Sequence, residues 1–224
     1  VTRTEVGQPI GSFFGYQVIG VFQNQSELDS SPKTPAQVVG DLKYADKNDD
    51  GEIDSEDRMN LGSPIPKFVY GFNTEIAYKS FDLSLDLQGQ YGNKIYNGKN
   101  AVRPDLYNFE ARVSGYWFGD GSTNSEPRPT ASGENYEPSS YFLEDGSYIR
   151  VRNVRIGYTF PSTLSNKLRL TKARAYLSGT NLLTITKYSG YTPEIGGSDG
   201  FSSGIDLGIY PITSVYSIGL NLTF

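Results

Sequence analysis

Between residues 46 and 57, oxygen-bearing side chains recur at a spacing that could bind a metal ion. The segment reads Asp-Lys-Asn-Asp-Asp-Gly-Glu-Ile-Asp-Ser-Glu-Asp. Gly51 stands at the sixth position, where a calcium loop turns sharply. Hard cations take roughly six to eight oxygen ligands, and alternate residues of a tight loop can direct such ligands at one centre. The pattern therefore predicts a structural Ca²⁺ ion.

The predicted ligands follow the order of the calcium loop of about twelve residues. They are Asp46, Asn48, Asp50, the backbone carbonyl of Glu52, Asp54 and Asp57. The last position departs from the usual glutamate, so the shorter Asp57 should bind more weakly or through water. Pro64 and Pro66 follow closely, and the flanks therefore differ from those of a helix–loop–helix sensor. The alternative is an acidic, Asx-rich surface turn that holds no ion.

The composition narrows the function classes. The chain has 224 residues with 25 Gly, 17 Tyr and 12 Phe, which favours an all-β fold because aromatic residues suit pleated sheets and glycine suits turns. It has no Cys and no His, which excludes thiol nucleophiles, zinc–thiolate sites and Ser-His-Asp triads. The net charge of −5 argues against general nucleic-acid binding. We therefore do not expect an enzyme.

The hydropathy pattern predicts no transmembrane helix, because the sequence lacks a run of about 18 apolar residues. The mean hydropathy of −0.44 leaves a membrane β-barrel open, since only alternate residues of its strands meet lipid. Residues 1–5 do not resemble a signal peptide. We expect either mature material or, in preference, a segment from within a longer protein.

Alternation of apolar and polar residues predicts a hairpin of two strands over residues 68–78 and 81–91. Only Lys79 and Ser80 separate the strands, and each strand has about the 9–11 residues that a tilted membrane strand needs. One face should meet lipid and the other a wet lumen. The lipid-facing set is Tyr70, Phe72, Ile76, Leu83, Leu85, Leu87, Ile218, Leu220 and Leu222; the lumen-facing set is Asn73, Glu75, Asp82, Asp86 and Asn221.

Three more strands are predicted at residues 154–160, about 169–184 and 211–224, the last being a closing strand. The connection 161–168 is short, whereas 92–145 and 189–208 are long and irregular. Barrels of outer membranes have short turns on the periplasmic side and long loops outside. The order of connections therefore favours an antiparallel transmembrane β-barrel over a soluble sandwich.

Several short segments also match a known family in their order along the chain. They are Gly15-Tyr16, Gly20-Val21-Phe22-Gln23, Gly40-Asp41-Leu42-Lys43-Tyr44, Asp46 to Gly51, Gly62 to Phe68, Tyr70-Gly71-Phe72-Asn73, Gly92 to Asn97, Glu144 to Arg150, Gly157 to Pro161, Ser178 to Leu182, Lys187 to Tyr191 and Pro193-Glu194. Over nearly its whole length, the chain resembles the C-terminal part of SusC/RagA-type TonB-dependent outer-membrane transporters of Bacteroidota.

This resemblance implies the C-terminal strands of a plugged barrel of about 22 strands. It also implies a SusD-like surface lipoprotein as partner, energy supplied through TonB, and uptake of glycans or peptides as nutrients. The plug, the TonB-contacting segment and the early strands of the family have no counterpart here, so we expect residues 1–224 to be a fragment of such a transporter, with an extracellular calcium-type loop at 46–57.

The sequence leaves two questions open: whether the sheet belongs to a soluble domain, and what three arginines contact. A secreted soluble β-domain that binds calcium and carbohydrate would bury the apolar faces against a second layer. Arg150, Arg152 and Arg155 lie above the third apolar run, where they could meet lipopolysaccharide phosphates or simply be solvated.

Overall fold

The computed structural model describes residues 1–102, 114–130, 132–197 and 200–224, and these form two compact units. The first unit comprises 1–65, 94–144 and 195–209, and the second comprises 66–93, 145–194 and 210–224. Residues 103–113 of the predicted long loop lie outside the described residues. Within the described ranges, no helix is both long enough and apolar enough to cross a membrane.

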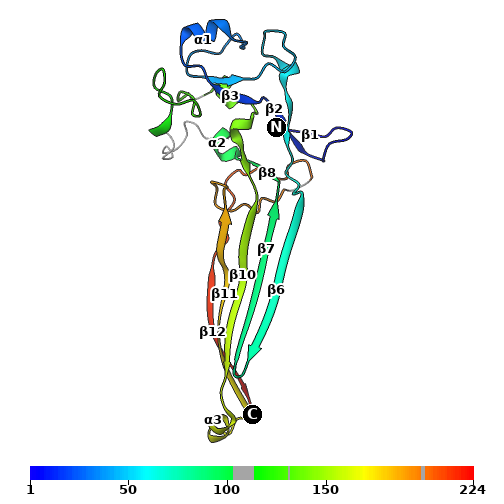
Figure 1. Ribbon diagram of the computed structural model, residues 1–224, viewed down its shortest axis with the longest axis vertical. Helices are drawn as coiled ribbons and strands as arrows, with labels where there is room; N and C mark the ends of the chain where they lie inside the picture. The colour runs from blue at the N-terminus through cyan, green and yellow to red at the C-terminus, as the bar shows by residue number, and fades with distance from the viewer. Residues whose placement is uncertain (103–113, 131, 198–199) are drawn as a thin grey trace. The chain divides into compact units, whose positions relative to one another are not determined.

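The second unit is an antiparallel sheet of five strands in the order β12-β11-β10-β7-β6 (Figure 1). Its strands are β6 (Phe68–Tyr78), β7 (Phe81–Tyr91), β10 (Tyr148–Thr159), β11 (Lys172–Thr186) and β12 (Val215–Thr223). A short helix, α3 (Ser162–Lys167), joins β10 to β11. Every neighbouring pair in this sheet is antiparallel, as the predicted up-and-down arrangement requires.

The hairpin of β6 and β7 has the predicted bounds. Tyr78 pairs with Phe81 across the two-residue turn, and Lys79 takes the left-handed conformation with φ of 54° that such turns need. Further along, Phe72 pairs with Leu87 and Ile76 with Leu83, so apolar residues oppose apolar residues on this face except at Thr74 and Gly89. The hydrophobic alternation therefore fixes the register.

The other strands lie where the sequence predicts them, but their ends differ. β10 begins at Tyr148, several residues before the predicted start at 154. The reason is a bulge: the register of β10 with both neighbours shifts between Val151 and Asn153. Arg152 becomes the extra residue, and Val151 and Val154 both stay on the apolar face. A bulge breaks the strict alternation from which strands are recognised.

The first unit consists of short elements around two small cores. They are β1 (Thr2–Arg3), β2 (Ser12–Gly15), β3 (Val18–Val21), α1 (Gln25–Ser30), β4 (Leu42–Tyr44), η1 (Ser55–Asp57), β5 (Met59–Gly62), β8 (Lys94–Tyr96), α2 (Gly98–Val102), η3 (Glu134–Tyr136), η4 (Ser140–Phe142) and β9 (Leu143–Asp145). The predicted irregular stretch 92–145 therefore contains several ordered elements. Strands of three or four residues are too short to show periodicity in the sequence.

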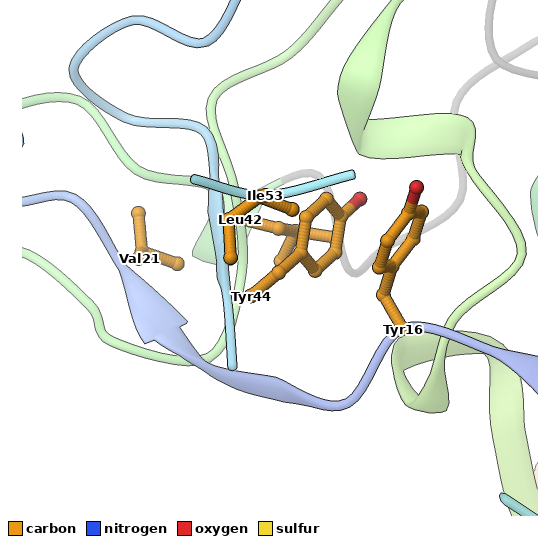
Figure 2. Packing of buried hydrophobic residues seen from close by; sticks show 5 residues of the cluster. All are labelled: Tyr16, Val21, Leu42, Tyr44 and Ile53. Carbon is orange, nitrogen blue, oxygen red and sulfur yellow. The ribbon is translucent and has the colours of Figure 1, made fainter. Parts of the chain in front are cut away.

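One core of this unit contains Tyr16, Val21, Leu42, Tyr44 and Ile53, which Figure 2 shows from close by. The rings of Tyr16 and Tyr44 stack with their centroids 4.8 Å apart. The Tyr44 hydroxyl donates to the carbonyl of Glu134, and burial raises the pKa of Tyr44 well above its usual range. Ile53 belongs to the acidic segment 46–57, so this core holds that segment in place.

Candidate functional site

The acidic loop, residues 46–57, is anchored by two buried side chains. Ile53 is 4% exposed in the core just described, and Asp57 is fully buried. The Asp57 carboxylate accepts hydrogen bonds from the backbone N–H of Lys47 at 2.7 Å and of Asp54 at 2.8 Å. It therefore ties the start of the loop to its end, and Asp54 completes a capping box at η1.

The other predicted ligands organise the backbone of the loop. The two Asp46 oxygens accept from the N–H of Asp49 at 2.7 Å and of Gly51 at 2.9 Å, and Asp50 accepts from the N–H of Glu52 at 2.9 Å. Gly51 has φ of +90°, the conformation expected of the glycine in a sharp turn. The sequence-predicted turn is therefore present, and its side chains lie on the same short loop.

The fit of this loop to Ca²⁺ is partial. Asn48, Asp50 and Asp54 are exposed, and each carboxylate oxygen that accepts one hydrogen bond keeps a second lone pair. Asp57, by contrast, uses both oxygens for the backbone inside the protein. Across the described residues, no three acidic side chains are arranged as a metal-binding group. Asp57 is best described as the residue that closes the loop.

The second candidate site is the pair of faces of the five-stranded sheet. On the apolar face, Phe72 is 57% exposed, Ile218 is 83% exposed and Leu220 is 65% exposed. The register places Leu85 opposite Val154, and Leu177 opposite Ile218, on this same face. In the described part of the chain, no second layer covers these side chains. Such a face needs an apolar surrounding, which lipid or another layer can supply.

The opposite face of the sheet is polar and internally paired. Arg174 Nε donates to Asp82 at 2.9 Å, and the Asn153 amide donates to Asp86 at 3.0 Å. Asn73 pairs with Asp86 across the strands, which places the predicted lumen-facing side chains together. We call this surface the polar face; it also carries Glu75, Asp82 and Asn221.

The arginines of β10 do not support a role at the lipid boundary. Arg150 is 3% exposed on the polar face, where it forms an ion pair with Glu194. Arg152 donates to Gln88 of the same face at 2.8 Å, and Arg155 lies against the ring of Tyr176. Arg150 is therefore buried rather than solvated, and its guanidinium has an internal partner 44 residues away in the sequence; contact of these arginines with lipopolysaccharide stays a prediction.

The fold and its two-faced sheet define an all-β chain of the kind found in solved transporter structures. The chain aligns over its full length with the RagAB peptide importer in its "closed-closed" state, with a TM-score of 0.72 and 22% identity, covering 24% of that chain. The "open-open" state gives a TM-score of 0.69 over 98% of this chain and 23% of that one. These similarities establish the fold.

Curated relatives identify the family. The chain is 35% identical over its full length to TonB-dependent receptor P26 of Formosa agariphila and 28% identical to TonB-dependent receptor SusC of Bacteroides thetaiotaomicron. No protein-family model matches. The chain covers 23% and 20% of these relatives, so it spans about a quarter of their length or less. It is part of a TonB-dependent receptor of the SusC/RagA type, as the sequence motifs indicated.

Proposed function

We propose that the five-stranded sheet is part of the wall of a closed, plugged barrel of about 22 strands in the cell outer membrane. The observation that carries the proposal is the sheet itself: one face pairs its polar groups, while the other leaves Phe72, Ile218 and Leu220 uncovered. A soluble domain, the alternative from the sequence, would bury these side chains against a second layer.

In this proposal the whole receptor imports glycans or peptides, together with a SusD-like lipoprotein and with energy delivered through TonB. The curated relatives are TonB-dependent receptors, and the structural relative is the RagAB peptide importer, which favours import over catalysis. The two-residue turn after β6 and the short α3 connection would lie on the periplasmic side. The acidic loop and the other long connections would then be extracellular, with residues 211–224 as the closing strand.

The experiment that tests this proposal compares lipid and water access to the two faces of β7 in the intact receptor. Labels at Leu83, Leu85 and Leu87 should meet lipid, and labels at Asp82, Ser84 and Asp86 should meet water. Strict alternation supports the barrel wall, whereas equal access on both faces contradicts it.

We also propose that the acidic loop binds Ca²⁺ through Asp46, Asn48, Asp50, the Glu52 carbonyl and Asp54. Asp57 would join only if its buried carboxylate, whose oxygens each keep one lone pair, comes within reach of the ion. The sequence pattern and the turn at Gly51 support this assignment. A bound cation would offset the repulsion among these carboxylates and hold the loop in one conformation.

Calcium titration of the intact receptor should show a site with a dissociation constant of about 10⁻⁴–10⁻³ M, as for other extracellular calcium modules. Asp50→Asn should weaken this site about tenfold or more, because a charged ligand is replaced by a neutral one. Asp49→Asn is the matched control, since Asp49 stands at a non-ligand position with φ of 59°, which Asn tolerates. Equal affinity in both variants, or no binding, would contradict the proposal.

A further inference from the structure

Three side chains on the polar face of the second unit, Tyr148, Arg150 and Gln88, contact the carboxylate of Glu194, and a fourth, Thr184, contacts Arg150. Tyr148, Arg150, Gln88 and Thr184 come from three neighbouring strands, β10, β7 and β11. Arg150 pairs with Gln88 on one side and Thr184 on the other, so these residues share a face by register. Glu194 lies outside the sheet, in the connection that follows β11.

The contacts around this carboxylate use both of its oxygens. The Tyr148 hydroxyl donates to Oε1 at 2.6 Å, and the Gln88 amide donates to the same oxygen at 2.8 Å. Arg150 Nη1 forms an ion pair with Oε2, while Arg150 Nε donates to Thr184 Oγ1 at 2.7 Å. The guanidinium also lies 5.3 Å from the centre of the Tyr148 ring. The Arg150 guanidinium and the Glu194 carboxylate therefore each contact several partners at once.

Burial of Arg150 strengthens these contacts, while the Glu194 side chain remains 30% exposed. Arg150 is 3% exposed, and a buried arginine without its carboxylate would be a costly unpaired charge. Hydrogen bonds between charged groups are shorter and stronger than neutral ones, and solvent screens them less when they are buried. Thr192 and Tyr188 of the same connection are also buried, at 2% and 5% exposure. Tyr188, Thr192 and Pro193 are therefore packed, while Lys187, Ser189 and Tyr191 of the same connection are exposed.

We propose that residues 187–194 form a fixed strap, fastened to the polar face by Glu194 as an internal carboxylate ligand of Arg150. Because the polar face would line the lumen, which rests on the proposed function, the strap would narrow the passage along this wall. It would also keep the start of the β11–β12 connection from moving when the receptor takes up substrate. Tyr148, Arg150 and Gln88 of the sheet thus form a binding site for the Glu194 carboxylate of the same chain.

The strap can be tested by cysteine labelling, since residues 1–224 contain no cysteine; any cysteine elsewhere in the receptor is first replaced by serine. In the intact receptor, Thr192→Cys should react slowly with a charged maleimide because position 192 is buried. Adding Glu194→Ala should raise the labelling rate by at least about tenfold, since several charge-assisted contacts are lost. Gln88→Ala, which removes one neutral donor, should have a smaller effect.

Two controls make the result specific. Glu75→Ala removes the same charge from an exposed position of the polar face and should leave labelling of Thr192→Cys unchanged. Ser189→Cys, at an exposed position, should react quickly with or without Glu194. If Glu194→Ala impairs assembly, Glu194→Asp, which shortens the arm, should give a smaller acceleration in an assembled receptor.

Fast labelling at position 192 in the otherwise unchanged receptor, or no acceleration by either Glu194 variant, would overturn the proposal. The outcome is independent of the barrel assignment: a strap could persist on a sheet that faces no lipid. In that case labelling would behave as expected, while the lipid-access pattern of β7 would fail.

Discussion

Removing residues 215–224, which are β12 and Phe224, from the intact receptor should abolish its assembly into the outer membrane. β12 pairs with β11 from Val215 to Thr223, and only one of its edges is paired within the described residues. In the closed barrel, its other edge would pair with the first strand. Without β12, both of those neighbours would present unpaired N–H and C=O groups to hydrocarbon, and each such group costs several kcal/mol.

The control variant keeps the strand and changes only its side chains. Ile218, Leu220 and Leu222 replaced together by Val keep the alternation and the pairing, so this variant should reach the outer membrane normally. Quantitative immunoblotting of outer-membrane fractions measures both proteins. Normal abundance and substrate uptake of the truncated receptor would show that β12 does not close a barrel.

Leu85→Arg should destabilise the receptor far more than Ser84→Arg. Leu85 lies near the middle of β7 on the apolar face, opposite Thr74 and Val154. An arginine facing lipid at mid-membrane costs about 2–4 kcal/mol. Ser84 is its neighbour on the polar face, opposite Glu75 and Arg155, where water solvates an added charge. Positions 84 and 85 are adjacent in β7, so the two arginines would lie on opposite faces of the sheet at nearly the same depth in the membrane.

The measurement for this pair is the stability of the purified, folded receptor against denaturant in lipid, together with its abundance in the membrane. Leu85→Arg should be depleted and should unfold at lower denaturant, whereas Ser84→Arg should remain close to the unchanged protein. Equal tolerance of both arginines would mean that the apolar face of β7 does not meet lipid.

The sequence predicted the β6–β7 hairpin to the residue because its alternation is interrupted only at Thr74 and Gly89 and its turn is short. β10 was harder, since the bulge at Arg152 shifts the period between Val151 and Val154. The short strands of the first unit had no signal at all, because three or four residues show no period. Long strands with a regular alternation can therefore be predicted from the sequence. Pairing between short segments that are distant in the sequence depends on tertiary packing, which a single sequence does not reveal.

In the candidate sites too, local spacing could be predicted from the sequence and long-range contacts could not. The spacing of oxygen-bearing residues predicted the turn at Gly51, but it gave no sign that Asp57 would be buried as a backbone cap. A carboxylate at a ligand position and one at a capping position have the same sequence signature. The ion pair of Arg150 with Glu194 was also missed, because nothing local connects residues 44 positions apart.

The most direct test of the central claim, that this sheet is the wall of an outer-membrane barrel, is spin-label accessibility along β7 in the intact receptor in lipid. Single labels at successive positions from Asp82 to Gln88 report collisions with oxygen, which dissolves in lipid, and with a nickel chelate, which stays in water. We expect oxygen to dominate at Leu83, Leu85 and Leu87 and the chelate to dominate at the positions between them, with a period of about two residues. Low oxygen access at the leucines, without alternation, would show that another protein layer covers them and would contradict the account.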